Sequence, residues 1–276
     1  MYRRKYGPNT QFLLKFLDAA VRLHIQAHPT IPLAQKYLNS NSGKTEAYVI
    51  LGIREEVRDP YIYLGFQHPV SKEDCKQAVI NQDTGRILSC FEKILIEPGD
   101  VFIVPCGLPH AIGEGVFIIE IMEPTDFAVR LEFERGGYVL PEEAQFMGRG
   151  VDFAMDMIEF KQITVEQVRQ QYFCKPELVN REGDFEEWIL IGEKQTSCFS
   201  VNKLKITGNH VRKSDNFHVG IVILGEGIIK GGNESVYVKK GGKFLILFKT
   251  KEVTYIASGV LEIVLTCRDP WLKQYG

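Results

Sequence analysis

The chain has 276 residues, of which 45% are hydrophobic and 25% are charged, a composition typical of a globular protein with one large or two small domains. The net charge of -2 gives no basis for nucleic-acid binding, and no apolar run is long enough to cross a membrane. Tyr6-Gly7-Pro8-Asn9 stands where a signal peptide would need its apolar core. The six cysteines form no Cys-x-x-Cys pair, which predicts reduced thiols in a cytoplasmic protein.

The segment from Gln11 to Arg22 contains a short apolar run whose periodicity fits a helix or a buried strand equally well. Lys15 interrupts this run. A lysine in such surroundings must snorkel to water, pair with a carboxylate or face a polar cavity.

The next stretch, Leu23 to Pro29, alternates apolar and polar residues and is typical of a strand. Because side chains alternate along a strand, Gln26 and His28 lie on the same face. Pro29 lacks a backbone donor and ends regular pairing. A short rigid element therefore offers two ligand-capable side chains in one direction, although two solvent-facing strand residues would give the same pattern.

Ile31 to Leu38 is predicted to be a short helix, since Pro32 suits its first turn. A polar loop follows, and Ala47 to Leu51 is predicted to be a strand with Glu46 at its mouth. Tyr61 to Phe66 is a second strand candidate. Ser71 can cap a helix that runs toward Cys90 with a break near Asp83-Thr84-Gly85.

Two further strands, Val101 to Pro105 and Val116 to Ile121, flank a glycine-proline turn that carries His110. Glu120 interrupts the apolar run of the second strand. Several short strands separated by turn signals predict an antiparallel sandwich or barrel.

The second half divides into a helix-rich segment, Pro141 to Gln171, and a new run of short strands between Phe185 and Arg268. We expect the helix-rich segment to be a connector packed on the first barrel. His210 and His218 have no acid or glutamine two residues away, so we interpret both as structural or surface residues.

Gln26, His28, Glu46 and His110 together supply two imidazole nitrogens, one carboxylate and one amide oxygen. This mixture suits zinc or another first-row divalent ion. Structural zinc sites are usually closed and rich in cysteine, whereas this set contains none, so it favours an open catalytic site.

Four motifs in this order resemble those of class I mannose-6-phosphate isomerases. They are Gln26-Ala27-His28-Pro29, Lys44-Thr45-Glu46, the segment Pro105 to Gly113, and Glu120 followed ten residues later by Arg130. The resemblance is densest from Phe12 to Arg135 and continues weakly to the end of the chain as a second barrel.

The resemblance implies a mainly β fold of two cupin-like (jelly-roll) β-barrels with a partly helical insertion and connector. The expected parts are a metal-binding cupin domain at 1–135, a helical connector at 136–184 and a second cupin-like domain without metal ligands at 185–276. Family members usually carry tens of residues before the lysine-bearing segment, so we expect a short variant or a piece of a larger protein.

The implied activity is the isomerisation of mannose 6-phosphate to fructose 6-phosphate through an enediol. The resemblance implies one zinc ion held by Gln26, His28, Glu46 and His110. It also implies a catalytic Arg130 and a substrate pocket containing Lys15, Lys44 and Glu120. Glu120 is a candidate proton-transfer base, because burial would raise its pKa, or a structural partner of a lysine.

His24 departs from the resemblance, because the family usually has a small hydroxyl residue at this position near the phosphate. It favours a rival interpretation, a non-catalytic cupin that binds a metal and a sugar or sugar phosphate. A third candidate is a metal cupin with another small-molecule substrate, such as a dioxygenase, although those usually use iron and more histidines.

Overall fold

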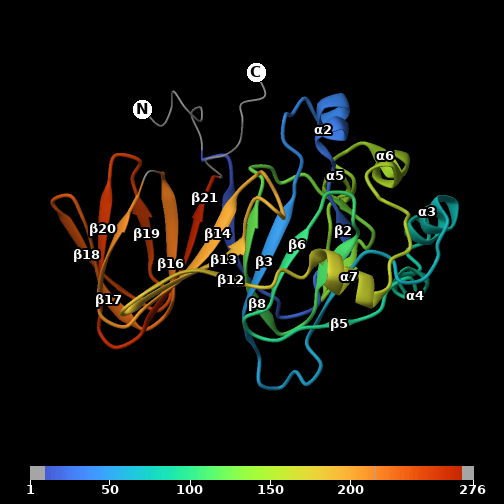
Figure 1. The fold of residues 1–276 in the computed structure, drawn as a ribbon. Helices are drawn as coiled ribbons and strands as arrows, with labels where there is room; N and C mark the ends of the chain where they lie inside the picture. The colour runs from blue at the N-terminus through green and yellow to red at the C-terminus, as the bar shows by residue number, and fades with distance from the viewer. Residues whose placement is uncertain (1–9, 215, 269–276) are drawn as a thin grey trace. The chain divides into compact units, whose positions relative to one another are not determined.

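The computed structural model describes residues 10–214 and 216–268 (Figure 1). Most of its regular structure is β-strand, as predicted from the sequence. The chain divides into two compact units. The first is Leu13–Phe173, and the described part of the second consists of residues 10–12 and 174–268.

The first unit contains two antiparallel sheets. One has the order β1 (Leu13–Asp18), β8 (Val116–Met122), β3 (Glu46–Ile53) and β6 (Val101–Val104). The other has the order β5 (Ile94–Leu95), β4 (Tyr61–Leu64), β7 (His110–Ile112), β2 (Gln26–Ala27) and β9 (Val129–Arg130). Both sheets contribute to one buried cluster that includes Tyr48, Phe102, Ile62, Leu64 and Ile112, so their apolar faces form a common core.

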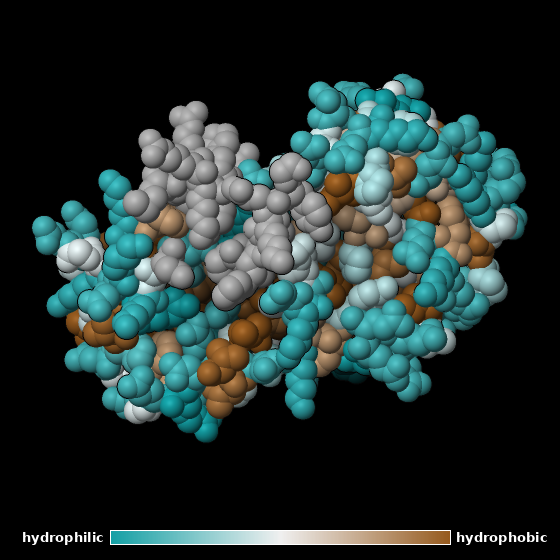
Figure 2. Space-filling model, turned by 45° about the horizontal axis from the view of Figure 1, so that its top comes forward, coloured by the Kyte–Doolittle hydropathy of each residue, from teal (hydrophilic) through white to brown (hydrophobic). Residues whose placement is uncertain are grey.

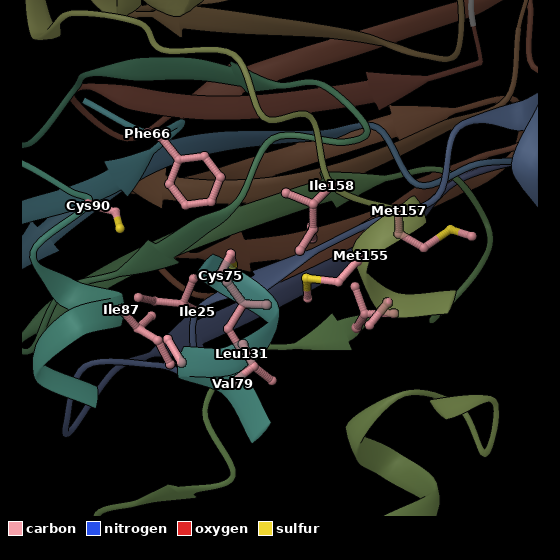
Figure 3. Packing of buried hydrophobic residues seen from close by; sticks show 14 of the residues in the cluster. Ile25, Phe66, Cys75, Val79, Ile87, Cys90, Leu131, Met155, Met157 and Ile158 are labelled. Carbon is pink, nitrogen blue, oxygen red and sulfur yellow. The ribbon is translucent and has the colours of Figure 1, made fainter. Parts of the chain in front are cut away.

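The described part of the first unit also contains helices. They are α2 (Ile31–Leu38), α3 (Lys72–Ile80), α4 (Thr84–Leu88), α5 (Glu142–Gln145), α6 (Gly150–Asp156) and α7 (Val165–Tyr172). The predicted cap of α3 is confirmed, since the Ser71 side chain accepts a hydrogen bond from the Asp74 backbone N–H. Figure 3 shows Cys75 and Val79 of α3 gathered with Ile25, Leu131 and Met155 in a second buried cluster. This cluster fixes the segment that carries Gln26 and His28.

Two local expectations are decided by the structure. The segment Gln11 to Arg22 contains a strand, β1, and its Lys15 pairs in register with Glu120 of β8. The prediction that His110 lies on a turn is wrong, because His110 begins β7 and is 1% exposed. Only the residues before it form the turn, and pairing with Leu64 and Gln26 draws His110 itself into the sheet.

The second unit also has two sheets. They are β12-β13-β14-β21-β16-β19 and β15-β20-β17-β18, and they share a core that includes Leu204, Val222, Ile229 and Tyr255. The strand bounds are β12 Glu177–Glu182, β13 Phe185–Ile191, β14 Ser200–Ile206, β15 Asn209–Lys213, β16 His218–Leu224, β17 Glu226–Gly231, β18 Glu234–Lys239, β19 Lys243–Ile246, β20 Glu252–Ala257 and β21 Leu261–Cys267.

The helix-rich segment belongs to the first unit. Phe153, Ala154 and Met155 of α6 are buried in its core, and α7 contributes Val168. The expected packing of this segment on the first set of strands is therefore confirmed, while the three-part domain division stays a prediction. A hairpin of β10 (Glu134–Arg135) and β11 (Tyr138–Val139) precedes these helices.

The face drawn in Figure 2 is mostly hydrophilic, with apolar side chains exposed in small groups. Among the described residues, no helix has both the length and the apolar character needed to cross a membrane.

Candidate metal centre

The register of the strands brings the four predicted ligands together from both sheets of the first unit. Gln26 in β2 lies between His110 of β7 and Arg130 of β9. His28 follows directly after β2, and Glu46 begins β3 in the other sheet. The ligands therefore meet between two sheets that share one core.

Three of these residues form a compact buried cluster. One ligand atom each from His28, Glu46 and His110 lies within 4.8 Å of the others, and none of these residues is more than 1% exposed. His28 Nε2 lies 3.0 Å from Glu46 Oε1, and His110 Nε2 lies 3.5 Å from Glu46 Oε2. The Gln26 amide nitrogen lies 3.5 Å from His110 Nε2, and a half-turn of the amide would bring its oxygen there.

Backbone carbonyls set the orientation of both imidazoles. His28 Nδ1 lies 2.7 Å from the Phe127 carbonyl, and His110 Nδ1 lies 2.8 Å from the Leu108 carbonyl. A carbonyl oxygen only accepts, so each Nδ1 carries the proton and donates it. The lone pair of each neutral ring is then on Nε2, which faces the Glu46 carboxylate. Two lone pairs and a carboxylate directed at one point fit a divalent cation.

The protonation states of the cluster suit metal binding. Burial lowers the pKa of His28 and lowers that of His110 to about 4, so both rings are neutral at pH 7. Burial alone would raise the pKa of Glu46, but the positive charge of neighbouring Lys44 helps to hold it well below its usual range. The ammonium of Lys44, itself buried, lies 2.9 Å from Glu46 Oε1.

A row of polar side chains crosses three strands beside this cluster. Glu120 of β8 is opposite Lys15 of β1 on one side and Tyr48 of β3 on the other. Burial and the Glu46 charge raise the pKa of Glu120 to about 8. Tyr48 donates a 2.8 Å hydrogen bond to Glu46 Oε2, so the row joins the cluster.

Two of the predicted substrate residues, Lys15 and Arg130, are partly exposed beside the buried cluster. Lys15 Nζ lies 4.0 Å from Glu120 Oε2 and 2.6 Å from Asp126 Oδ1, and the Lys15 side chain is 37% exposed. Arg130 is half-buried, and its guanidinium donates to the Ala144 carbonyl at 2.7 Å. Lysine and arginine thus flank the centre with positive charge.

His24 belongs to a neighbouring group of charged residues. Burial lowers its pKa, although Glu132 acts against this, and Arg130 and Arg135 lower it further. Among the described residues, no hydrogen bond or ion pair joins His24 to the four proposed ligands. The structure therefore associates His24 with Arg130 rather than with the metal cluster.

Four supporting residues were not recognised in the sequence. The Glu123 carboxylate accepts hydrogen bonds from the backbone N–H groups of Gly43 and Thr45. These bonds fix the loop that carries Lys44. Glu132 forms a buried ion pair with Arg22 and accepts the N–H of Ile25. The other two are Asp126 and Tyr48. Only Tyr48 had a local signal, because it stands two residues after Glu46 on the same strand face.

Comparison with known proteins gives similarities that extend over both units. Residues 193–267 match the family model for the cupin domain of mannose-6-phosphate isomerase. The chain is 30% identical over 236 residues to the probable mannose-6-phosphate isomerase GmuF of Bacillus subtilis, a match that covers 85% of this chain and 68% of that protein. It is 26% identical over 254 residues to the mannose-6-phosphate isomerase of Streptococcus mutans, covering 91% and 72%.

Two solved structures have folds similar to that of this chain. The crystal structure of mannose 6-phosphate isomerase from Bacillus subtilis matches with a TM-score of 0.72 and 21% sequence identity, over 92% of this chain and 74% of that chain. A putative mannosephosphate isomerase from Archaeoglobus fulgidus also matches with a TM-score of 0.72, at 17% identity over 97% of this chain and 75% of that chain.

Proposed function

The chain belongs to the mannose-6-phosphate isomerase family, and on this premise we propose that it interconverts mannose 6-phosphate and fructose 6-phosphate. The observation that carries the proposal is the buried cluster of His28, Glu46 and His110, whose ligand atoms lie within 4.8 Å of one another. The reaction moves a proton between two neighbouring carbons of the sugar through an enediol. Its substrate is a small anion, which suits the lysines and arginine around the cluster. A cytoplasmic location is consistent with six cysteines that form no Cys-x-x-Cys pair in the sequence.

One zinc ion is the proposed cofactor, and His28, Glu46, His110 and Gln26 are its proposed ligands. Two neutral imidazoles, a carboxylate and an amide oxygen are a donor set for zinc or another first-row divalent ion. When bound, the ion would supply Lewis acidity toward the sugar oxygens.

Glu120 is the proposed residue that accepts and returns the migrating proton. A pKa of about 8 lies near neutral pH, where a carboxylate can both take up and release a proton. Lys15, 4.0 Å from Glu120 Oε2, stabilises the ionised form. Glu120 is 4% exposed, so bulk water competes little for this proton.

Arg130, Lys15, Lys44 and His24 are the proposed substrate contacts. One nitrogen of the Arg130 guanidinium donates a hydrogen bond to the Ala144 carbonyl, and its other N–H donors can stabilise the negative charge of an enediolate. Lys15 is partly exposed and suits the phosphate, whereas buried Lys44 suits a sugar oxygen close to Glu46. His24, between Arg130 and Glu132, adds a neutral hydrogen-bonding group to the same region.

A coupled isomerase assay on zinc-loaded protein tests these roles. We expect His28→Ala to lose bound zinc and at least 1,000-fold in kcat, on the order expected when a catalytic metal is lost. Arg130→Ala should retain zinc and lose roughly 100-fold or more in kcat, because it removes charge stabilisation from the reacting sugar.

The matched controls are His68→Ala and Arg58→Ala, which alter exposed residues of the same unit and should leave kcat unchanged. Unchanged turnover in both His28→Ala and Arg130→Ala would overturn the isomerase proposal. Wild-type protein that binds zinc and sugar phosphate without turnover would instead be a non-catalytic metal cupin.

A further inference from the structure

A hollow lies in the unit that contains residues 174–268, at one end of the sheet formed by β15, β20, β17 and β18. Its volume is about 990 Å³. Four lysines line it, Lys213, Lys230, Lys249 and Lys251, together with three hydroxyl residues and a single carboxylate, Glu252. All four lysines are exposed to solvent.

Strand register explains how these lysines come together. Lys213 of β15 is opposite Glu252 of β20, and Lys230 of β17 is opposite Thr254 of β20. The intervening Val253 is buried in the core, so the side chains at 252 and 254 face outward with their partners. The segment before β20 contributes Lys249 and Lys251 and is tied to β15 by a 2.8 Å hydrogen bond from the Ser214 N–H to the Lys251 carbonyl.

The described residues that line this hollow carry more positive than negative charge. They include four lysines and one glutamate, in a chain whose net charge is -2. Other basic residues of this unit form ion pairs, such as Arg181 with Glu186 and Lys194 with Glu177. Among the described residues, no ion pair joins any lysine of the hollow to a carboxylate. Like charges gathered in this way repel one another, and an anion between them would relieve the repulsion.

We propose that this hollow binds a small anion carrying two or more phosphate groups, at a site separate from the metal centre. Its volume lies at the upper end of the roughly 300–1,000 Å³ of small-molecule sites. Each lysine ammonium can donate to phosphate oxygens as a point charge, and hydroxyls at Thr250 and Thr254 add neutral donors. A single phosphate can meet only part of this array, which favours a longer polyphosphate.

Calorimetric titration of the full chain with inorganic tripolyphosphate tests the proposal, with orthophosphate in a second series. We expect one tripolyphosphate per chain, bound at least 10-fold more tightly than orthophosphate. Lys230→Gln/Lys251→Gln should weaken binding at least 10-fold. The matched control is Lys239→Gln/Lys240→Gln, which removes the same charge at the other end of the β17–β18 hairpin and should change binding less than 2-fold.

Three results would overturn the proposal: equal weakening by both double variants, loss of tripolyphosphate binding in His28→Ala, and affinity for oligonucleotides that rises with their length. The first indicates a diffuse surface charge, the second binding at the metal centre and the third a nucleic-acid surface. If Lys230→Gln/Lys251→Gln does not fold by circular dichroism, Lys213→Gln/Lys249→Gln takes its place with the same expected loss.

Discussion

At the scale of single residues, the decisive feature is that two backbone carbonyls fix the tautomers of His28 and His110. The carbonyls of Phe127 and Leu108 hold the Nδ1 protons, so each ring presents a neutral Nε2 to Glu46. Residue types and spacing in the sequence were enough to propose as ligands four residues that the structure brings close together. The tautomers were not predictable, because the carbonyls that set them come from chain segments whose path is fixed only by the fold.

The lowered histidine pKa values predict metal binding that resists mild acid. For two histidines with the ordinary pKa of about 6.5, protonation would weaken zinc affinity by about 100-fold between pH 7.5 and pH 5.5. Because burial lowers the pKa of His28 and lowers that of His110 to about 4, we expect a smaller loss of zinc affinity over this range. Competition with a chelator of known pH dependence measures it. A 100-fold weakening at pH 5.5 would contradict the expectation.

The raised pKa of Glu120 predicts that the free energy of unfolding falls as the pH rises. Its pKa is about 8 in the folded chain and about 4.5 when unfolded, so the folded state holds the extra proton between these values. Its contribution to stability is therefore fully present below pH 4.5 and is lost as pH rises through 8. Glu120→Gln, which cannot ionise, should gain stability relative to wild type between pH 5 and pH 8.5, by on the order of 3 kcal/mol.

Urea denaturation of the metal-free proteins at the two pH values measures this difference. Glu114→Gln, an exposed residue of the turn before β8, is the control and should keep a constant offset from wild type. A Glu120→Gln offset that does not change with pH would show that Glu120 ionises normally.

At the scale of elements, Glu123 holds the loop before β3 in place. Its two carboxylate oxygens accept N–H groups of Gly43 and Thr45, at 3.2 and 2.9 Å, and it is 5% exposed. In Glu123→Gln, the side-chain NH2 group would replace one carboxylate oxygen and face one of the two backbone N–H groups, so that hydrogen bond would be lost. We expect the free energy of unfolding to fall by about 1–3 kcal/mol and zinc affinity to weaken, because the loop positions Lys44 and Glu46.

Denaturation and zinc titration of Glu123→Gln measure the two effects. Glu56→Gln, in an exposed turn of the same unit, is the matched control and should change neither quantity. Weakened stability with unchanged zinc affinity would mean that the loop supports the fold without positioning the ligands.

Elements marked by capping, proline or turn residues were predictable from the sequence. The helix at Ile31–Leu38 and the break between α3 and α4 lie where capping and turn residues indicated. His110 was misjudged because glycine and proline before it dominate the local pattern, while its pairing with Leu64 and Gln26 joins distant segments. The Arg22–Glu132 ion pair was missed for the same reason, since its members are 110 residues apart.

At the scale of the whole molecule, the proposed metal ligands all lie within the unit Leu13–Phe173. Binding of a ligand to the folded state alone raises its stability by about 2.7 kcal/mol when the ligand is at 100 times its Kd. We therefore expect two calorimetric transitions, of which zinc removal by a chelator lowers only one. Phe185→Ala, in the core of the other unit, should lower the second. An equal shift of both transitions on zinc removal would show that the units unfold as one.

The position of Gln26 between His110 and Arg130 has a consequence for ligand binding. Its backbone pairs with both, so a proposed zinc ligand and the proposed enediolate-binding arginine share one rung of the sheet. A ligand that fixes the position of His110 or of Arg130 therefore also restricts the position of the other residue. Zinc and sugar phosphate should accordingly be cooperative ligands, and thermodynamic reciprocity requires each to tighten the other by the same factor.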